Sequence, residues 1–390
     1  MQPAGSRVAA SVALGVSLAL AVTACGSSTA TPLTPPSASQ PAPSSSAGRA
    51  TGSSDPLGAL TAAARAEGGL TTIGLPHDWC NYGEAVKTFQ REFGITVTEL
   101  NPDAGFGDQV AAIRPAASSP ADVPDVIDVS LPVAAAAAKA GLLAPYKVGS
   151  WDTIPVAAKD PAGAWTGDYF GVLAFESNHN AVPTPPTDWS ELLRPAYAND
   201  VALAGDPRVS DQAIQTVYAA ALANGGTLDN AKPGLAFFAA LKKAGNLLPT
   251  IAGPGTIDSG TTPLSIRWSY NALSHRDASA GDPAIDVTVP AHGRLAGFDV
   301  QAISKAAAHP NAARLWLEFL YSDEGQLIWL KGNCNPIRLA DLLDRDAVPA
   351  DLMAALPDID GVVFPSLPQL NAASALIVKG WDGTVGLDIK

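Results

Sequence analysis

Short apolar stretches alternate with helical segments along the chain from about residue 57. Strands are predicted at 70–74, 95–100 and 126–129, between predicted helices at 57–67, 84–93 and 108–113. A second series follows, with strands predicted at 172–176, 201–203, 264–268, 285–289 and 298–303. This alternation favours an α/β fold built on a parallel, doubly wound sheet.

Composition limits the possible partners. The chain has 390 residues, of which 47% are hydrophobic and 16% charged, so there is enough apolar material for a large core. The formal net charge is −13 and no basic run occurs, so we expect no nucleic-acid partner, because an acidic surface repels phosphate backbones. No later apolar run is long enough to cross a bilayer.

Common catalytic and metal-binding motifs are absent from the sequence. There is no G-x-S-x-G or H-E-x-x-H, and the histidines at 77, 179, 275, 292 and 309 lack metal-ligand spacing. Gly105 and Gly107 are not followed by the third glycine of a dinucleotide motif, because Val110 stands there. We therefore expect no cofactor, no metal and no enzyme activity. An exported enzyme that uses paired carboxylates, and an adhesion or signalling lipoprotein, stay open as alternatives.

The pattern of the N-terminal segment predicts an export signal. Arg7 precedes the uncharged run 8–24, which ends in Ala24 before Cys25. A cysteine directly after a small residue resembles the lipobox of bacterial lipoproteins, in which the thiol takes a diacylglycerol. That resemblance implies a signal peptide at 1–24, lipidation at Cys25, and anchoring at the outer face of the cell membrane. The alternative is an ordinary secretory signal with a chance cysteine. Residues 25–55, rich in Ser, Thr, Pro and Ala, predict a disordered tether.

Several stretches of the body resemble the extracytoplasmic solute-binding proteins of ABC importers, in the subgroup that takes polyamines, thiamine, iron or phosphonates. They are 93–97, 124–129 with 140–146, 165–171 with Asn178, and 303–306 with 309–313 and 324–326. The resemblance implies a two-lobed, periplasmic-binding-protein-like (type II) α/β fold with a ligand cleft between the lobes. Residues 56–178 would begin lobe one, 179–292 would form lobe two, and 293–390 would complete lobe one. The implied partners are a small-molecule solute and the importer's permease subunits, and the protein would be a monomer.

Candidate binding residues follow from the position of ligands in α/β lobes, at the carboxyl ends of strands and at helix N-termini. Together with the expected lobe crossings, this rule selects Asp78, Trp79, Asn81, Tyr82, Asp128, Ser130, Glu176, Asn178, Trp268, Tyr270 and Asp299. The alternative is core packing for each aromatic residue, and a helix cap or surface charge for each acid.

The candidate residues include acids and aromatics but few bases, which predicts a small organic cation such as a polyamine or a thiamine-like amine. Asp299 lies in a stretch similar to that around the amine-binding aspartate of polyamine binders. Gly297 stands where that family has a tryptophan, which removes one stacking wall. The alternative is a phosphonate or carboxylate anion held by helix N-termini with Arg267 or Arg294. No Tyr-Tyr pair occurs, which disfavours iron.

The remaining two cysteines are expected to pair. With Cys25 set aside, Cys80 and Cys334 remain in an oxidising compartment, and both map to lobe one in the family layout. The alternative is two separate buried thiols.

Overall fold

The computed structural model describes residues 55–114, 123–354 and 356–390. The predicted signal peptide 1–24, the lipidation site Cys25 and the tether up to residue 54 lie outside these ranges. Among the described residues, no helix combines the length and apolar character that a membrane crossing requires.

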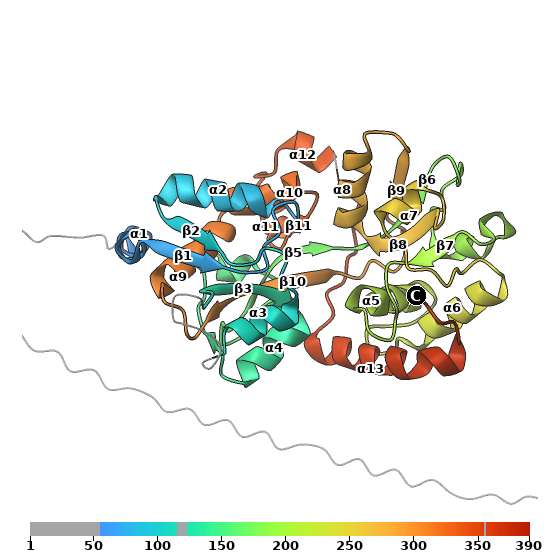
Figure 1. Cartoon of the computed structure of the whole chain (residues 1–390), viewed down its shortest axis with the longest axis horizontal. Helices are drawn as coiled ribbons and strands as arrows, with labels where there is room; N and C mark the ends of the chain where they lie inside the picture. Colours follow the sequence, from blue (N-terminus) through green and yellow to red (C-terminus); the bar gives the residue numbers. More distant parts are fainter. Residues whose placement is uncertain (1–54, 115–122, 355) are drawn as a thin grey trace, which may run out of the picture. The chain divides into compact units, whose positions relative to one another are not determined.

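Lobe one is built first along the chain and centres on one five-stranded antiparallel sheet (Figure 1). Strands β5, β10 and β3 lie side by side in this sheet, with β11 at the edge next to β5 and β4 paired with β10. A separate pair, β1 and β2, runs parallel. The elements are α1 (Pro56–Glu67), β1 (Gly69–Thr72), α2 (Tyr82–Phe93), β2 (Thr96–Glu99), α3 (Phe106–Ala112), β3 (Val126–Ser130), α4 (Leu131–Lys139), β4 (Leu143–Ala144) and β5 (Thr166–Gly171).

Lobe two contains the sheet β7-β8-β6-β9. Its elements are β6 (Leu173–Asn178), β7 (Val201–Leu203), α5 (Asp211–Ala223), α6 (Lys232–Lys243), α7 (Pro254–Asp258), β8 (Leu264–Trp268), α8 (Ser269–Ser279) and β9 (Ile285–Thr288). The chain then returns to lobe one through β10 (Gly297–Ser304), α9 (Pro310–Leu320), α10 (Asp323–Lys331), β11 (Asn335–Pro336), α11 (Leu339–Asp344) and α12 (Ala350–Ala354).

The lobe-one sheet is antiparallel and the lobe-two sheet is mixed, whereas the sequence alternation favours parallel sheets. Strand β10 runs antiparallel to β3, β4 and β5, and β6 runs antiparallel to β8 and β9. Only the β1–β2 and β7–β8 pairs are parallel among the described strands. The cause is the crossing between lobes, which brings β10 back through the middle of the first sheet in the opposite direction.

The lobe boundaries differ from the expected ones at two places. Strand β6 pairs with β8 and β9, so the change of lobe falls at Val172, before the expected boundary at residue 178. The final helix α13 (Leu367–Thr384) packs mainly against α5 and α6 of lobe two, although 293–390 were expected in lobe one (Figure 1). Its buried residues Ala373, Ile377 and Trp381 recur every four positions and form one apolar face, which lobe two covers.

Candidate ligand-binding site

A pocket of about 430 Å³ opens between residues of both lobes and of α13. Lobe one contributes Trp79, Phe106, residues 130–132 and residues 296–299, which include Ser130 and Asp299. Lobe two contributes Asp211, Gln212, Gln215, Trp268, Tyr270 and Asn271, and α13 adds Leu370, Asn371 and Ser374. A pocket with walls from two lobes suits a ligand that contacts both.

Aromatic rings form one wall of the pocket. The rings of Trp268 and Tyr270 stack with an interplanar angle of 17° and centroids 6.3 Å apart. Trp79 meets Tyr270 edge-on at 5.4 Å, and its indole N–H donates a hydrogen bond to the Tyr169 hydroxyl. These contacts hold the rings in place before any ligand arrives.

Two glycines make room for the stacked rings. Gly171 of β5 and Gly297 of β10 are direct partners in the sheet. A Cβ atom at Gly171 would overlap the Tyr270 ring, and one at Gly297 would overlap the Trp268 ring. The prediction that Gly297 removes a stacking wall is therefore corrected, because the Trp268 ring of lobe two occupies the space beside it.

Two carboxylates line the pocket, one from each lobe. Asp299 lies in β10 directly opposite Ser130 of β3, and is partly exposed. Asp211 is the first residue of α5 and is exposed. Burial, and then the charge of Asp211, raise the pKa of Asp299 to about 7. No lysine, arginine or histidine of the described residues lines this pocket.

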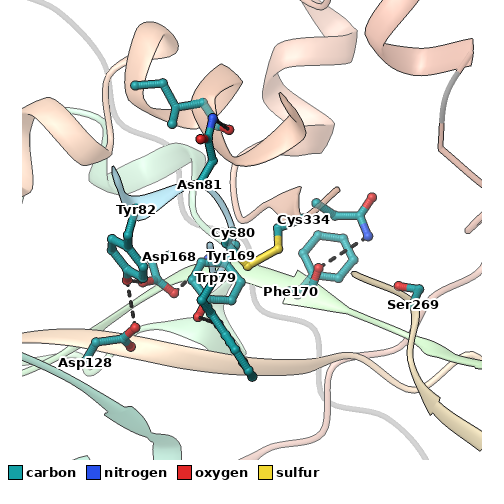
Figure 2. The surroundings of a disulfide bond; sticks show 12 residues. Trp79, Cys80, Asn81, Tyr82, Asp128, Asp168, Tyr169, Phe170, Ser269 and Cys334 are labelled. Atoms are coloured by element: carbon teal, nitrogen blue, oxygen red, sulfur yellow. Dashed lines mark hydrogen bonds between the residues drawn. A yellow bond between two sulfur atoms is a disulfide. The ribbon is translucent and has the colours of Figure 1, made fainter. Parts of the chain in front are cut away.

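A second layer of acids lies beneath Asp299. The Tyr82 hydroxyl, which is fully buried, donates to Asp128 Oδ2 at 2.7 Å and contacts Asp168 Oδ2 at 2.9 Å (Figure 2). Gln301 donates through Nε2 to the Tyr82 oxygen at 2.7 Å. Burial, and then the charge of Asp299, raise the pKa of Asp168 to about 8. Burial, and then Asp168, raise the pKa of Asp128 well above its usual range.

The disulfide Cys80–Cys334 lies next to this group of residues (Figure 2). It joins the loop after β1 to the residue before β11, across 254 positions of sequence, with Cα atoms 5.5 Å apart. Cys80 and Asn81 both have positive φ, 47° and 67°. The bond therefore fixes a loop of unusual backbone conformation at the position where Trp79 enters the pocket.

Five of the residues selected from sequence line the pocket, namely Trp79, Ser130, Trp268, Tyr270 and Asp299. Tyr82 and Asp128 lie in the buried layer just described. Asp78 is exposed outside the pocket, and Asn81 donates to the Ile328 carbonyl at 3.4 Å. Both follow β1, but the loop turns only Trp79 toward the pocket.

Two further candidates have structural partners inside lobe two instead of facing the pocket. Glu176 is fully buried and accepts from His275 at 2.5 Å and Arg267 at 3.2 Å. Asn178 donates to the carbonyls of Ile257 and Asp258, each at 3.0 Å. The reason is that β6 lies inside the lobe-two sheet, so these residues fall along a central strand and not at a lobe crossing.

The bases considered for an anion are engaged elsewhere. Arg267 pairs with Glu176, and Arg294 donates to the carbonyls of Pro290 and Asp360 and pairs with Asp358. Within the described ranges, no cluster of three or more His, Cys, Asp or Glu residues could hold a metal ion.

Sequence reasoning missed Asp168, Asp211, Gln215 and the pocket residues of α13. Asp211 follows β7 and begins a helix, so the rule that selected Ser130 could have found it. Asp168 lies within the Trp165–Gly171 motif but has no such signal, and only the register of β5 against β10 brings it under Asp299.

The comparisons agree with this architecture. The family of bacterial extracellular solute-binding proteins matches residues 121–358, and the chain belongs to that family. Comparison with curated proteins gave no match.

Among solved structures, the chain is similar to three two-lobed binding proteins. The periplasmic binding protein AfuA from Actinobacillus pleuropneumoniae, with fructose-6-phosphate bound, is 20% identical, with a TM-score of 0.59 over 82% of this chain and 99% of that one. Iron-bound HitA from Pseudomonas aeruginosa is 20% identical, with a TM-score of 0.58 over 82% and 99%. The ferric iron-binding protein A of Mannheimia haemolytica, in an open conformation, is 17% identical, with a TM-score of 0.61 over 83% and 99%. These likenesses confirm the two-lobed α/β fold that the sequence predicts.

Proposed function

We propose that this solute-binding protein captures a small organic cation and delivers it to an ABC importer. The observation that carries the proposal is the lining of the pocket, which combines Asp299, Asp211 and stacked aromatic rings with no basic side chain among the described residues. A desolvated ammonium needs charge-assisted hydrogen bonds, which carboxylates supply, and ring faces add about 0.5–2 kcal/mol for each cation–π contact.

Delivery would take place at the outer face of the cell membrane. We propose that Cys25 carries the lipid and that residues 25–55 form the tether between the membrane and the body. The arrangement would keep the binding lobes close to the permease while leaving them free to close around the solute.

The buried acids beneath the pocket support the same proposal. Asp128 and Asp168 lie close to Asp299, and no base in the described part of the chain neutralises them. An arriving cation would favour the charged forms of these acids, so a positive ligand gains electrostatic free energy that a neutral analogue does not.

An anion is the second candidate function. The specific observation is that α4 and α8 begin at the pocket without a side-chain cap, so N–H groups of their first turns have no side-chain acceptor. Two positions are excluded, because Pro132 of α4 has no N–H and the Ser269 N–H of α8 donates to the Val172 carbonyl. The carboxylates at the pocket oppose it, because they repel a negative ligand placed between the lobes.

A thermal-shift panel tests the proposal. The amines would be 1,4-diaminobutane, spermidine, thiamine and choline, and the anions inorganic phosphate, citrate and fructose 6-phosphate. We expect an amine to raise Tm, by an amount equivalent to about 2.7 kcal/mol at a hundredfold excess over Kd, and to be recovered chemically unchanged. A shift given by anions alone would contradict the proposal, and conversion of the solute would indicate an exported enzyme.

A further inference from the structure

Acceptor groups from both lobes surround the pocket. Asp299 comes from β10, and Asp211 from the first turn of α5. Gln215 follows Asp211 by four residues, so the two side chains lie on the same face of the helix. All three line the pocket.

Two polar atoms at this pocket are unpartnered within the described structure. Ser130 is 8% exposed, and its Oγ atom has no hydrogen-bond partner among the described residues. Gln215 Oε1 is likewise buried without a partner there. Because a buried polar atom without a partner costs free energy, both atoms indicate that something else supplies the hydrogen bond.

We propose that the solute presents a primary ammonium group. Its three N–H groups donate hydrogen bonds to Asp299, to Asp211 and to the side-chain oxygen of Gln215. This proposal rests on the proposed function, that the pocket takes an organic cation. Asp211 is thereby a binding residue of lobe two, and the ammonium contacts acceptors of both lobes at once. Ser130, beside Asp299, takes a polar substituent next to the ammonium.

The number of N–H bonds distinguishes this ligand class from other cations. A primary ammonium has three donors, so it can satisfy three acceptors at once. A quaternary ammonium has none, and its methyl groups would leave the same oxygens desolvated and unpaired. Ring stacking alone favours either cation, so the acceptors decide between them.

Calorimetry with matched probes tests the proposal on the full mature chain. The probes are 1,4-diaminobutane and 2-phenylethylamine, each against the counterpart in which every ammonium carries three methyl groups. We expect the better primary amine to bind at least about tenfold more tightly than its methylated counterpart. Equal or tighter binding of the methylated probe would overturn the proposal.

Variants separate this inference from the proposed function. Asp211→Asn should weaken binding of the primary amine by about tenfold to a hundredfold, and the methylated probe by less. Asp152→Asn, which removes an exposed carboxylate away from the pocket, serves as the charge-matched control and should change neither. If Asp211→Asn binds the amine normally while Asp299→Asn does not, the cation function stands and the primary-ammonium assignment falls. If only anions bind, both fall.

Discussion

Gly297 has no side chain, and the space this leaves is occupied by the Trp268 ring. Its Cα lies against the Trp268 ring, so Gly297→Ala would push that ring out of its stack with Tyr270. Amine binding should then weaken about tenfold, because one cation–π wall is displaced. Calorimetric titration of the amine found in the panel measures the loss.

A second substitution provides the control for this prediction. Trp268→Phe shortens the ring that meets the new Cβ atom, so adding it to Gly297→Ala should recover part of the lost affinity. If the double variant binds no better than Gly297→Ala alone, overlap with Trp268 is not the cause of the loss.

The acid layer predicts an unusual dependence of stability on pH. The pKa of Asp168 rises from 3.8 to about 8 on folding, so between these values the native chain holds a proton that the unfolded chain has released. Stability contributed by this group is present below pH 3.8 and declines as pH rises through about 8. The groups that face it are Tyr82, Asp128, Tyr169, Asp299 and Gln301.

Thermal unfolding of the ligand-free protein checks this dependence. Tm should fall between pH 5 and pH 8.5 in the native protein, and fall less in Asp168→Asn, which keeps the shape without the charge. An Asp168→Asn profile that matches the native one would show that this carboxyl is not the titrating group.

At the scale of elements, the disulfide links the loop after β1 to Cys334, the residue before β11. Closing a loop of 254 residues stabilises the fold by about 5.5 kcal/mol in the chain-entropy model. The double variant Cys80→Ser, Cys334→Ser should therefore lose free energy of unfolding of that order, measured by denaturant titration. Thiol labelling of the unreduced, unfolded body should find no free thiol, and two labelled cysteines would contradict the bond.

The sequence predicted elements better than their arrangement. Strand 264–268 is predicted with the correct bounds and helix 57–67 to within one residue of α1, because apolar residues mark both segments. Strand direction was not predictable, since alternation of strands and helices gives their order but not which neighbours pair. The packing of α13 on lobe two was missed for the same reason, because an apolar stripe predicts that a helix face is buried but not which element covers it.

The site shows the same division. Residues at the carboxyl end of a strand or in the loop that follows it, such as Ser130 and Trp79, could be selected because chain position alone places them near a cleft. Glu176 was misplaced, since its surroundings depend on β6 pairing inside lobe two. The role of Asp168 depends on register between β5 and β10, which no local pattern encodes.

At the scale of the whole molecule, the first prediction concerns anchoring. If Cys25 carries a diacylglycerol, each buried methylene adds about 0.8 kcal/mol, and two or three chains hold the protein firmly at the membrane. Cys25→Ser should release or mislocalise the protein, as measured by fractionation and immunoblotting. Unchanged membrane retention of this variant would contradict lipidation.

The central claim is that carboxylates in the interlobe pocket bind a cation. Calorimetric titration with the amine that gives the largest thermal shift, on the native protein and on Asp299→Asn, tests it most directly. We predict a binding loss of about tenfold to a hundredfold in Asp299→Asn with the fold intact. Tight binding of an anion that Arg267→Ala or Arg294→Ala abolishes, and that Asp299→Asn leaves unchanged, would contradict it.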